Sequence, residues 1–180
     1  MPISLRITAL ALCLAALPGI ALAEKADREK PVTIKASKAS ADDRNKVQIF
    51  EENVRLVQGT LEITTDKLVV SQDAEGFQKG VATGGKDGLA RFRQKREGRD
   101  EYIEGEAERI EYDGRTDTAR LFVRAQVRSG PNESRGPYIE YNGYTELYTL
   151  SAQPSSGVSK SSDGVTVIIA PRSAQPARKP

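Results

Sequence analysis

An alternation of apolar and polar residues runs from Val47 to Val70, over the sequence VQIFEENVRLVQGTLEITTDKLVV. Successive side chains of a β-strand point to opposite faces, so this two-residue period predicts strands with one buried face. Polar residues and one glycine interrupt the alternation at 51–53, 58–59 and 65–66. We therefore expect four short strands joined by tight turns, which together form an antiparallel meander.

The first 23 residues have the order of charged, apolar and small residues that is typical of a secretory signal peptide. Arg6 precedes an apolar run over residues 7–17, and small residues mark a cleavage site after Ala23. The run is shorter than the ~20 residues of a membrane-spanning helix, which disfavours an uncleaved anchor. A leucine rather than a small residue precedes Cys13, which disfavours lipidation. We expect an exported protein that begins at Glu24.

Composition excludes several kinds of function. Removal of the signal peptide leaves 157 residues without His or Cys, a size suited to one domain. The usual ligands for zinc, copper and haem and the commonest general base are therefore missing, and no nucleophile motif of a hydrolase is present. We expect no enzyme activity, no metal site and no cofactor. The mature net charge of +1 gives no support for nucleic acid as a partner.

The mature chain divides into five segments by composition. We expect a charged disordered N-terminus, a β-domain, a serine-rich linker, a terminal strand and a basic disordered tail. Their bounds are 24–30, 31–150, 151–164, 165–170 and 171–180. A β-prone strand at the end of a flexible linker must pair or aggregate, so we expect it to pair with its own sheet or with a neighbouring subunit.

Charged residues of opposite sign follow one another in the second half of the domain. Ala90 and Phe92 share one face of a predicted strand, and Arg91 and Arg93 share the other. Further basic residues follow, up to Arg99, and then a run of acidic residues. Two interpretations are open. The two clusters pair across neighbouring strands on a solvated face, or the arginines lie at an opening and meet anionic groups of a ligand.

Two stretches of the domain are similar to each other. Asp43 followed by Phe50 to Val57 resembles Asp113 followed by Leu121 to Arg128. A repeat of about 70 residues indicates hairpins stacked along one axis rather than two domains. The apolar faces then line a sandwich. They either pack only against each other or present a groove for acyl chains, in which each methylene removed from water contributes ~0.8 kcal/mol.

A series of short motifs runs through the domain. They are Phe50 to Val54, Gln58-Gly59, Leu61, Ile63, Asp66 to Leu68, Ala90 to Gln94, Glu104-Gly105, Ala107 and Tyr112-Asp113. In this order and spacing they resemble the OstA-like family of LptA-type periplasmic lipopolysaccharide-transport proteins, over about Pro31 to Leu150. The resemblance implies an all-β fold, an open, twisted antiparallel β-jellyroll or sandwich of many short strands.

The resemblance also implies partners. Family members join end to end between inner-membrane and outer-membrane components, and the bridge that they form carries the acyl chains of lipopolysaccharide in a hydrophobic groove. An uncapped jellyroll exposes unpaired strand edges, and pairing of unlike ends gives an open filament. The candidate edges are residues 32–36 at one end and residues 138–150 or 165–170 at the other.

Ligand-facing positions of the family fall on four residues of this chain. They are Val32, Ile34, Phe92 and Tyr112. Alternation along the strands adds five more to the predicted acyl-chain groove, namely Leu61, Ile63, Ile110, Leu121 and Val123. Arg91 and Arg93 are the candidate phosphate contacts. Glu52 stands where the family often has glycine, and Arg124-Ala125 where a Gly-Asn pair is common, so the turns there do not follow from the resemblance.

Three other functions make different predictions. A structural, self-associating β-scaffold without lipid would unfold when Ile34 or Phe92 is replaced by Asp. A carboxylate-based glycan hydrolase would need a close pair of acids with one raised pKa, whereas the acids here alternate with apolar residues as on a solvated face. A membrane-anchored component of the same pathway would not begin at Glu24.

Overall fold

The computed structural model describes residues 30–73, 76–96, 100–152 and 164–169. The predicted signal peptide and basic tail lie outside these residues, as do residues 24–29 of the predicted N-terminal segment and most of the linker. The strands are β1 (Thr33–Lys35), β2 (Lys38–Asp42), β3 (Val47–Gln58), β4 (Leu61–Asp73), β5 (Gly76–Thr83), β6 (Ala90–Lys95), β7 (Tyr102–Ala107), β8 (Arg109–Asp113), β9 (Thr118–Ser129), β10 (Asn132–Asn142), β11 (Leu147–Ser151) and β12 (Thr166–Ile168). A 3-10 turn, η1 (Lys86–Gly88), precedes β6. In the described part of the chain, no helix is long and apolar enough to cross a membrane.

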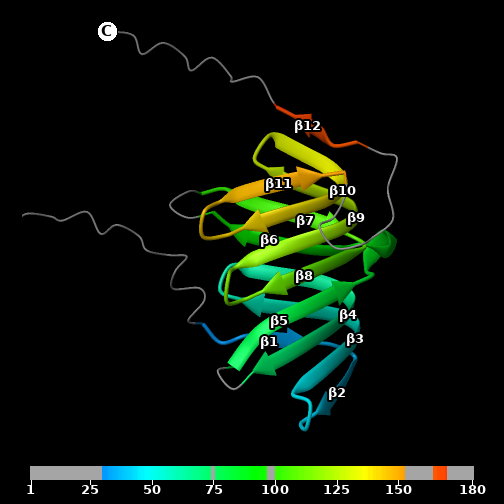
Figure 1. The fold of residues 1–180 in the computed structure, drawn as a ribbon. Helices are drawn as coiled ribbons and strands as arrows, with labels where there is room; N and C mark the ends of the chain where they lie inside the picture. Colours follow the sequence, from blue (N-terminus) through cyan, green and yellow to red (C-terminus); the bar gives the residue numbers. More distant parts are fainter. Residues whose placement is uncertain (1–29, 74–75, 97–99, 153–163, 170–180) are drawn as a thin grey trace, which may run out of the picture.

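The twelve strands form one antiparallel sheet that folds over into two layers (Figure 1). Layer 1 has the order β2-β3-β4-β5-β8-β9-β10-β11, and layer 2 has the order β1-β3-β4-β6-β7-β9-β10-β12. Four long strands, β3, β4, β9 and β10, belong to both layers because each half pairs with different neighbours. The predicted all-β jellyroll is confirmed, and long bent strands rather than separate short ones join its layers.

Residues in the left-handed conformation mark two of these bends. In β3, Glu52 and Asn53 have φ of 65° and 54°, and the register with β4 shifts there. In β9, Val123 and Arg124 have φ of 62° and 52°. The two bends lie 71 residues apart, as the sequence repeat predicts. Bulges of this kind increase local twist and turn a strand from one layer into the next.

The four short strands expected between Val47 and Val70 are instead two long ones. Of the three predicted interruptions, the one at Gln58-Gly59 is a chain reversal between β3 and β4. The one at 51–53 is the β3 bend. At Thr65 the chain passes between layers, and the Thr65 hydroxyl donates to the carbonyl oxygen of Thr83, 2.8 Å away. Polar interruptions mark bends as well as turns, so the sequence pattern alone did not separate the two.

The bends gather along one long edge of the sandwich, which we call the closed edge, and the hairpin turns along the opposite edge, which we call the mouth. The β2–β3, β8–β9 and β10–β11 turns are built alike. Each starts with an Asp or Asn side chain that accepts a backbone N–H two or three residues on, and each ends with a residue at φ near 50°. In Figure 1 the β8–β9 and β10–β11 turns lie on the left.

Candidate functional site

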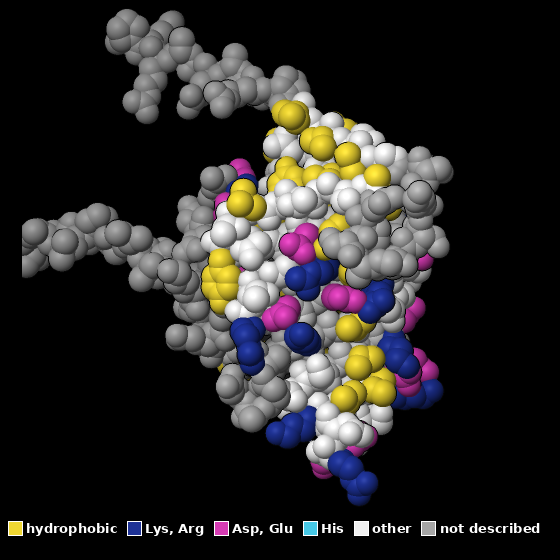
Figure 2. All heavy atoms as spheres, viewed as in Figure 1, with side chains coloured by type: hydrophobic (Ala, Val, Ile, Leu, Met, Phe, Trp, Pro, Cys, Tyr) yellow, Lys and Arg dark blue, Asp and Glu magenta, His cyan; other side chains and the backbone are white. Residues whose placement is uncertain are grey.

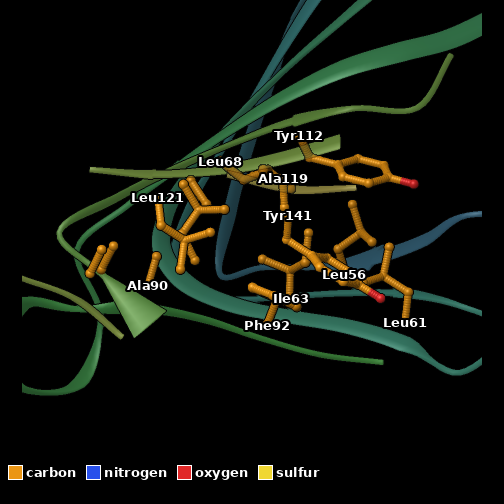
Figure 3. Packing of buried hydrophobic residues seen from close by; sticks show 14 of the residues in the cluster. Leu56, Leu61, Ile63, Leu68, Ala90, Phe92, Tyr112, Ala119, Leu121 and Tyr141 are labelled. Carbon is orange, nitrogen blue, oxygen red and sulfur yellow. The ribbon is translucent and has the colours of Figure 1, made fainter. Parts of the chain in front are cut away.

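Apolar side chains fill the space between the layers. Six predicted groove residues are buried in this cluster, namely Leu61, Ile63, Phe92, Ile110, Tyr112 and Leu121. Val32 and Ile34 are partly buried and pack against it at the β1 end, and Leu150 does the same at the β11 end. Across the sandwich, Figure 3 shows Leu121 and Ala90, near the closed edge, on one side of the cluster, and Leu61 with the Tyr112 ring, near the mouth, on the other. The cluster therefore extends from one end of the sheet to the other. Acyl-chain binding by these residues stays a prediction.

Val123 was predicted to share the inward face with Leu121, and this is wrong. Its side chain is 42% exposed, whereas Leu121 is fully buried. Val123 lies in the β9 bend, and its positive φ breaks the alternation of side chains between the two faces. Ala125 and Val127, beyond the bend, point inward again. Val123 is therefore a surface residue of the closed edge.

Phe92 occupies the centre of the interior. Its ring covers Gly105, the residue opposite it on β7, where a Cβ atom would lie 2.8 Å from Cζ. On its other side the ring stacks with that of Tyr141, with centroids 6.4 Å apart and planes at 17°. A narrow cavity of about 10 Å³, partly open to solvent, adjoins these rings. Its walls include Leu61, Ile63, Phe92, Ile110, Tyr112, Ala119 and Tyr141. The cavity is about the size of one water molecule, so a chain that enters here must first separate the two layers.

Polar groups occur at the mouth side of the cavity. The Tyr112 hydroxyl donates to Asp117 Oδ1 at 2.8 Å, and both residues are buried. Asp117 ends the β8–β9 turn, and its backbone carbonyl accepts the N–H of Gly143 at 2.8 Å. A side chain at Gly143 would collide with the Asp117 carboxylate. The mouth is therefore lined by fixed polar groups, with apolar side chains behind them.

Arg96 and Glu146 form an ion pair across the mouth. Arg96 follows β6 in layer 2, and Glu146 ends the turn before β11 in layer 1. Arg96 Nη2 lies 2.6 Å from Glu146 Oε2, and Nη1 donates to Ser129 Oγ at 3.1 Å. Both side chains of the pair are largely buried, with 16% and 25% exposed. The hydrogen bond to Glu146 raises the pKa of Arg96 above its usual value.

Arg91 and Arg93 lie on the outer face of layer 2, opposite to Phe92, as predicted. Arg91 Nε lies 2.9 Å from Glu106, and Arg93 Nε lies 3.3 Å from Glu104. Both are cross-strand pairs between β6 and β7. The charged clusters therefore pair across neighbouring strands, which is the first of the two interpretations of the sequence. A depression of about 370 Å³ lies between these side chains on the outer face, and Phe92 and Gly105 also line it. Phosphate binding by the two arginines stays a prediction.

Sequence reasoning missed several residues of the site. Tyr141 alternates with buried Ile139 on β10, so its inward position could have been found from the pattern. Arg96 and Glu146 are 50 residues apart, and no local signal connects them. In the described segments of the chain, no group of three or more His, Cys, Asp or Glu side chains is placed to hold a metal ion.

The two ends of the sheet carry unlike strands. β1 and β2 form one end, and β11 and β12 form the other. β12 lies inside the predicted terminal strand and pairs with Glu133 to Arg135 of β10, within its own chain. Large apolar side chains are exposed at this end, including Leu147, Tyr148, Val167 and Ile168. Figure 2 shows hydrophobic side chains near the top of the molecule, where β11 and β12 lie, and mixed charges over the middle of the face.

Comparison with known proteins gives one family. A family model described as "LptA/(LptD N-terminal domain) LPS transport protein" matches residues 33–147. The lipopolysaccharide export system protein LptH of Pseudomonas aeruginosa is 25% identical over 153 residues, which cover 85% of this chain and 86% of LptH. The lipopolysaccharide export system protein LptA of Escherichia coli K12 is 25% identical over 169 residues, which cover 94% of this chain and 85% of LptA.

A solved structure has the same fold. The crystal structure of LptH, described as the LptA homologous periplasmic component of the lipopolysaccharide transport device of P. aeruginosa, matches with a TM-score of 0.74. The match covers 81% of this chain and 99% of that chain, at 23% identity. At this identity the likeness concerns the fold. It confirms the β-jellyroll that the sequence motifs imply.

Proposed function

Because this chain belongs to the LptA and LptD N-terminal-domain family of lipopolysaccharide transport proteins, we propose that it carries lipopolysaccharide across the periplasm with the acyl chains between its two layers. The observation that supports this most strongly is the apolar cluster, which reaches both end strands and lies behind a mouth. Each methylene that moves there from water contributes ~0.8 kcal/mol. Several acyl chains could therefore supply most of the affinity for a lipid.

The proposal includes end-to-end assembly. An end strand presents unpaired backbone groups, and the β1–β2 end differs from the β11–β12 end in sequence and shape. Contact between unlike ends is heterologous, so it continues as a filament rather than closing into a dimer. Such a filament aligns the interiors of successive copies. Its outermost copies would meet the inner-membrane and outer-membrane components of the transport machinery.

Photocrosslinking tests the lipid site. A photoreactive amino acid replaces Phe92, which faces the interior, or Arg120, which lies on the outer face of layer 1 and pairs with Glu140. With purified lipopolysaccharide we expect a crosslink at position 92 and none at 120. Equal labelling at both positions, or labelling at neither, would contradict binding between the layers. A probe at Arg93 tests the predicted phosphate contact, because labelling there places the headgroup on the outer face.

The alternative function is a self-associating β-scaffold without lipid. Ile34 distinguishes the two because it is only partly buried, so Ile34→Asp removes apolar lining at less cost to the core than a change at Phe92. The lipid-binding proposal predicts a folded variant, by circular dichroism, with weakened lipopolysaccharide binding. Unfolding of Ile34→Asp, or unchanged binding by the folded variant, favours the scaffold.

Mixing blocked copies tests the assembly. Ala39 on β2 and Leu147 on β11 are exposed at opposite ends, and Lys at either position places a charge on an end strand. We expect Ala39→Lys and Leu147→Lys each to sediment as a monomer and their mixture to form dimers, because each copy keeps one competent end. Oligomers of either variant alone that match the wild type would contradict end-to-end contact through these strands.

A further inference from the structure

The Arg96–Glu146 pair connects the two layers on the side where a lipid would enter. Ion pairs within the sheet, such as Arg120–Glu140, join neighbouring strands of a single layer. Arg96 and Glu146 instead come from opposite sides of the mouth, with 2.6 Å between Nη2 and Oε2. A chain that enters at this position must separate these two side chains.

The carboxylate of this pair is only half satisfied. Glu146 Oε2 accepts from Arg96, but Oε1 is buried and accepts no hydrogen bond. A buried carboxylate oxygen without a donor costs free energy, and burial of both partners adds a desolvation penalty. Glu146 also has a φ of 53°, a backbone conformation that residues other than glycine adopt at a cost in free energy. The contact is therefore suited to exchange for a better anion.

The guanidinium of Arg96 is held in place independently of Glu146. Its Nη1 donates to Ser129 Oγ at the end of β9 and lies 3.8 Å from the exposed carboxylate of Glu101, whose backbone carbonyl accepts the Arg96 N–H at 2.9 Å. Lys95, the preceding residue, adds a second positive charge nearby and contacts the exposed Asp100 carboxylate at 2.8 Å. A phosphate offers several acceptor oxygens in a geometry that matches the guanidinium fork. Arg96 would thus keep its position when Glu146 is displaced.

The apolar cavity begins next to this cation. Gln94, two residues before Arg96, lines this cavity, as does Tyr141, whose ring stacks on Phe92. A positive group and the apolar interior therefore adjoin at one point of the mouth. This order matches an amphiphile that carries a phosphate directly beside its acyl chains. Arg91 and Arg93 lie instead on the outer face, where each pairs with a glutamate of the neighbouring strand.

Resting on the proposed lipid transport, we infer that Arg96 recognises a phosphate on the headgroup of an acylated glycolipid, and that this phosphate replaces the Glu146 carboxylate and releases the mouth. The closed and lipid-bound states then differ by an exchange of anions on one guanidinium. Glu146 acts as a placeholder that keeps Arg96 paired when no lipid is bound.

Binding of two forms of one lipid tests this inference. The probes are lipid A with both phosphates and the same lipid A after removal of its phosphates, each competing with a fluorescent lipid A in detergent. The proteins are the wild type, Arg96→Gln, Glu146→Gln and, as a matched control, Arg120→Gln, which breaks an ion pair of similar length on the outer face. We expect Arg96→Gln to lower the preference for the phosphorylated form over the other form about tenfold, the size of one charged hydrogen bond.

For Glu146→Gln we expect the opposite change in affinity for phosphorylated lipid A. Glu146→Gln removes the competing carboxylate, so the phosphorylated form should bind more tightly, while Arg120→Gln changes neither affinity. An unchanged preference for phosphorylated lipid A in Arg96→Gln would overturn the inference. If Arg96→Gln does not fold, Glu146→Gln decides: tighter binding supports the exchange, and unchanged or weaker binding overturns it. Wild-type protein that binds neither lipid would overturn the proposed function, and this inference with it.

Discussion

The close approach of Phe92 to Gly105 predicts the cost of adding a single methyl group. In Gly105→Ala the new Cβ would lie 2.8 Å from Cζ and 2.9 Å from Cδ1 of the Phe92 ring, and closer still to Cε1. These distances are shorter than side-chain contacts allow, so the ring must move within a packed interior. Overpacking of this kind costs about 1–3 kcal/mol. Replacement of glycine also lowers the conformational entropy of the unfolded chain, which stabilises the folded state by about 0.4–1 kcal/mol. We expect a net destabilisation of about 1–2 kcal/mol.

A double-mutant cycle assigns this cost to the ring. The free energy of unfolding is measured in urea for the wild type, Gly105→Ala, Phe92→Leu and the double variant. Leucine lacks the distal ring atoms, so Gly105→Ala should cost at least about 1 kcal/mol less in that background. Gly164→Ala is the control, because no atom lies within 4 Å of the added Cβ. Equal costs of Gly105→Ala in both backgrounds, or no cost in the wild type, would refute the placement of the ring over Gly105.

Two further predictions concern the bend in β9 and the buried Tyr138. Val123 is exposed and has a φ of 62°, so Val123→Gly should relieve backbone strain and raise the free energy of unfolding by about 0.5–1 kcal/mol, as measured by thermal unfolding. Val123→Ala is the control and should be stabilised less. An equal gain in both variants would contradict strain as the cause. Burial, followed by the hydrogen bond to Glu140, raises the pKa of Tyr138 to about 12. The stabilisation from this raised pKa is fully present below pH 10 and is lost as the pH rises toward 12. Over this range Tyr138→Phe should lose less stability than the wild type, as measured by urea unfolding at each pH. Equal losses in the two proteins would contradict the raised pKa.

Alternation between the faces predicted the fold class and most of the interior because it reports directly on burial. Leu61 and Ile63, and likewise Ile110 and Tyr112, follow the two-residue period and face inward. The period fails where the backbone has an irregular conformation. Val123 is β-branched, a residue type that disfavours positive φ, so nothing in its identity indicated a bend.

Long-range contacts mark the second limit of sequence reasoning. Arg93 and Glu104 belong to charged clusters on consecutive strands, and their pairing follows from that order. Arg96 and Glu146 meet because the jellyroll brings the end of β6 opposite the β10–β11 turn, a consequence of the whole topology. The ion pair at the mouth was therefore visible only in the structure, whereas most of the apolar interior could be predicted from the sequence.

The number of acyl chains should decide whether a lipid can enter. The layers are joined covalently at the closed edge, so separation at the mouth first exposes side chains such as Leu61, Tyr112, Phe92 and Tyr141. Loss of burial for four such side chains costs about 6–12 kcal/mol, whereas one chain of ten methylenes contributes about 8 kcal/mol. A single chain thus barely offsets the opening, and several chains exceed it. We expect lipid A to displace a bound fluorescent lipid at concentrations at which lauric acid, at equal total chain content, does not. Equal displacement by both would show that the interior opens without the cost that its packing implies.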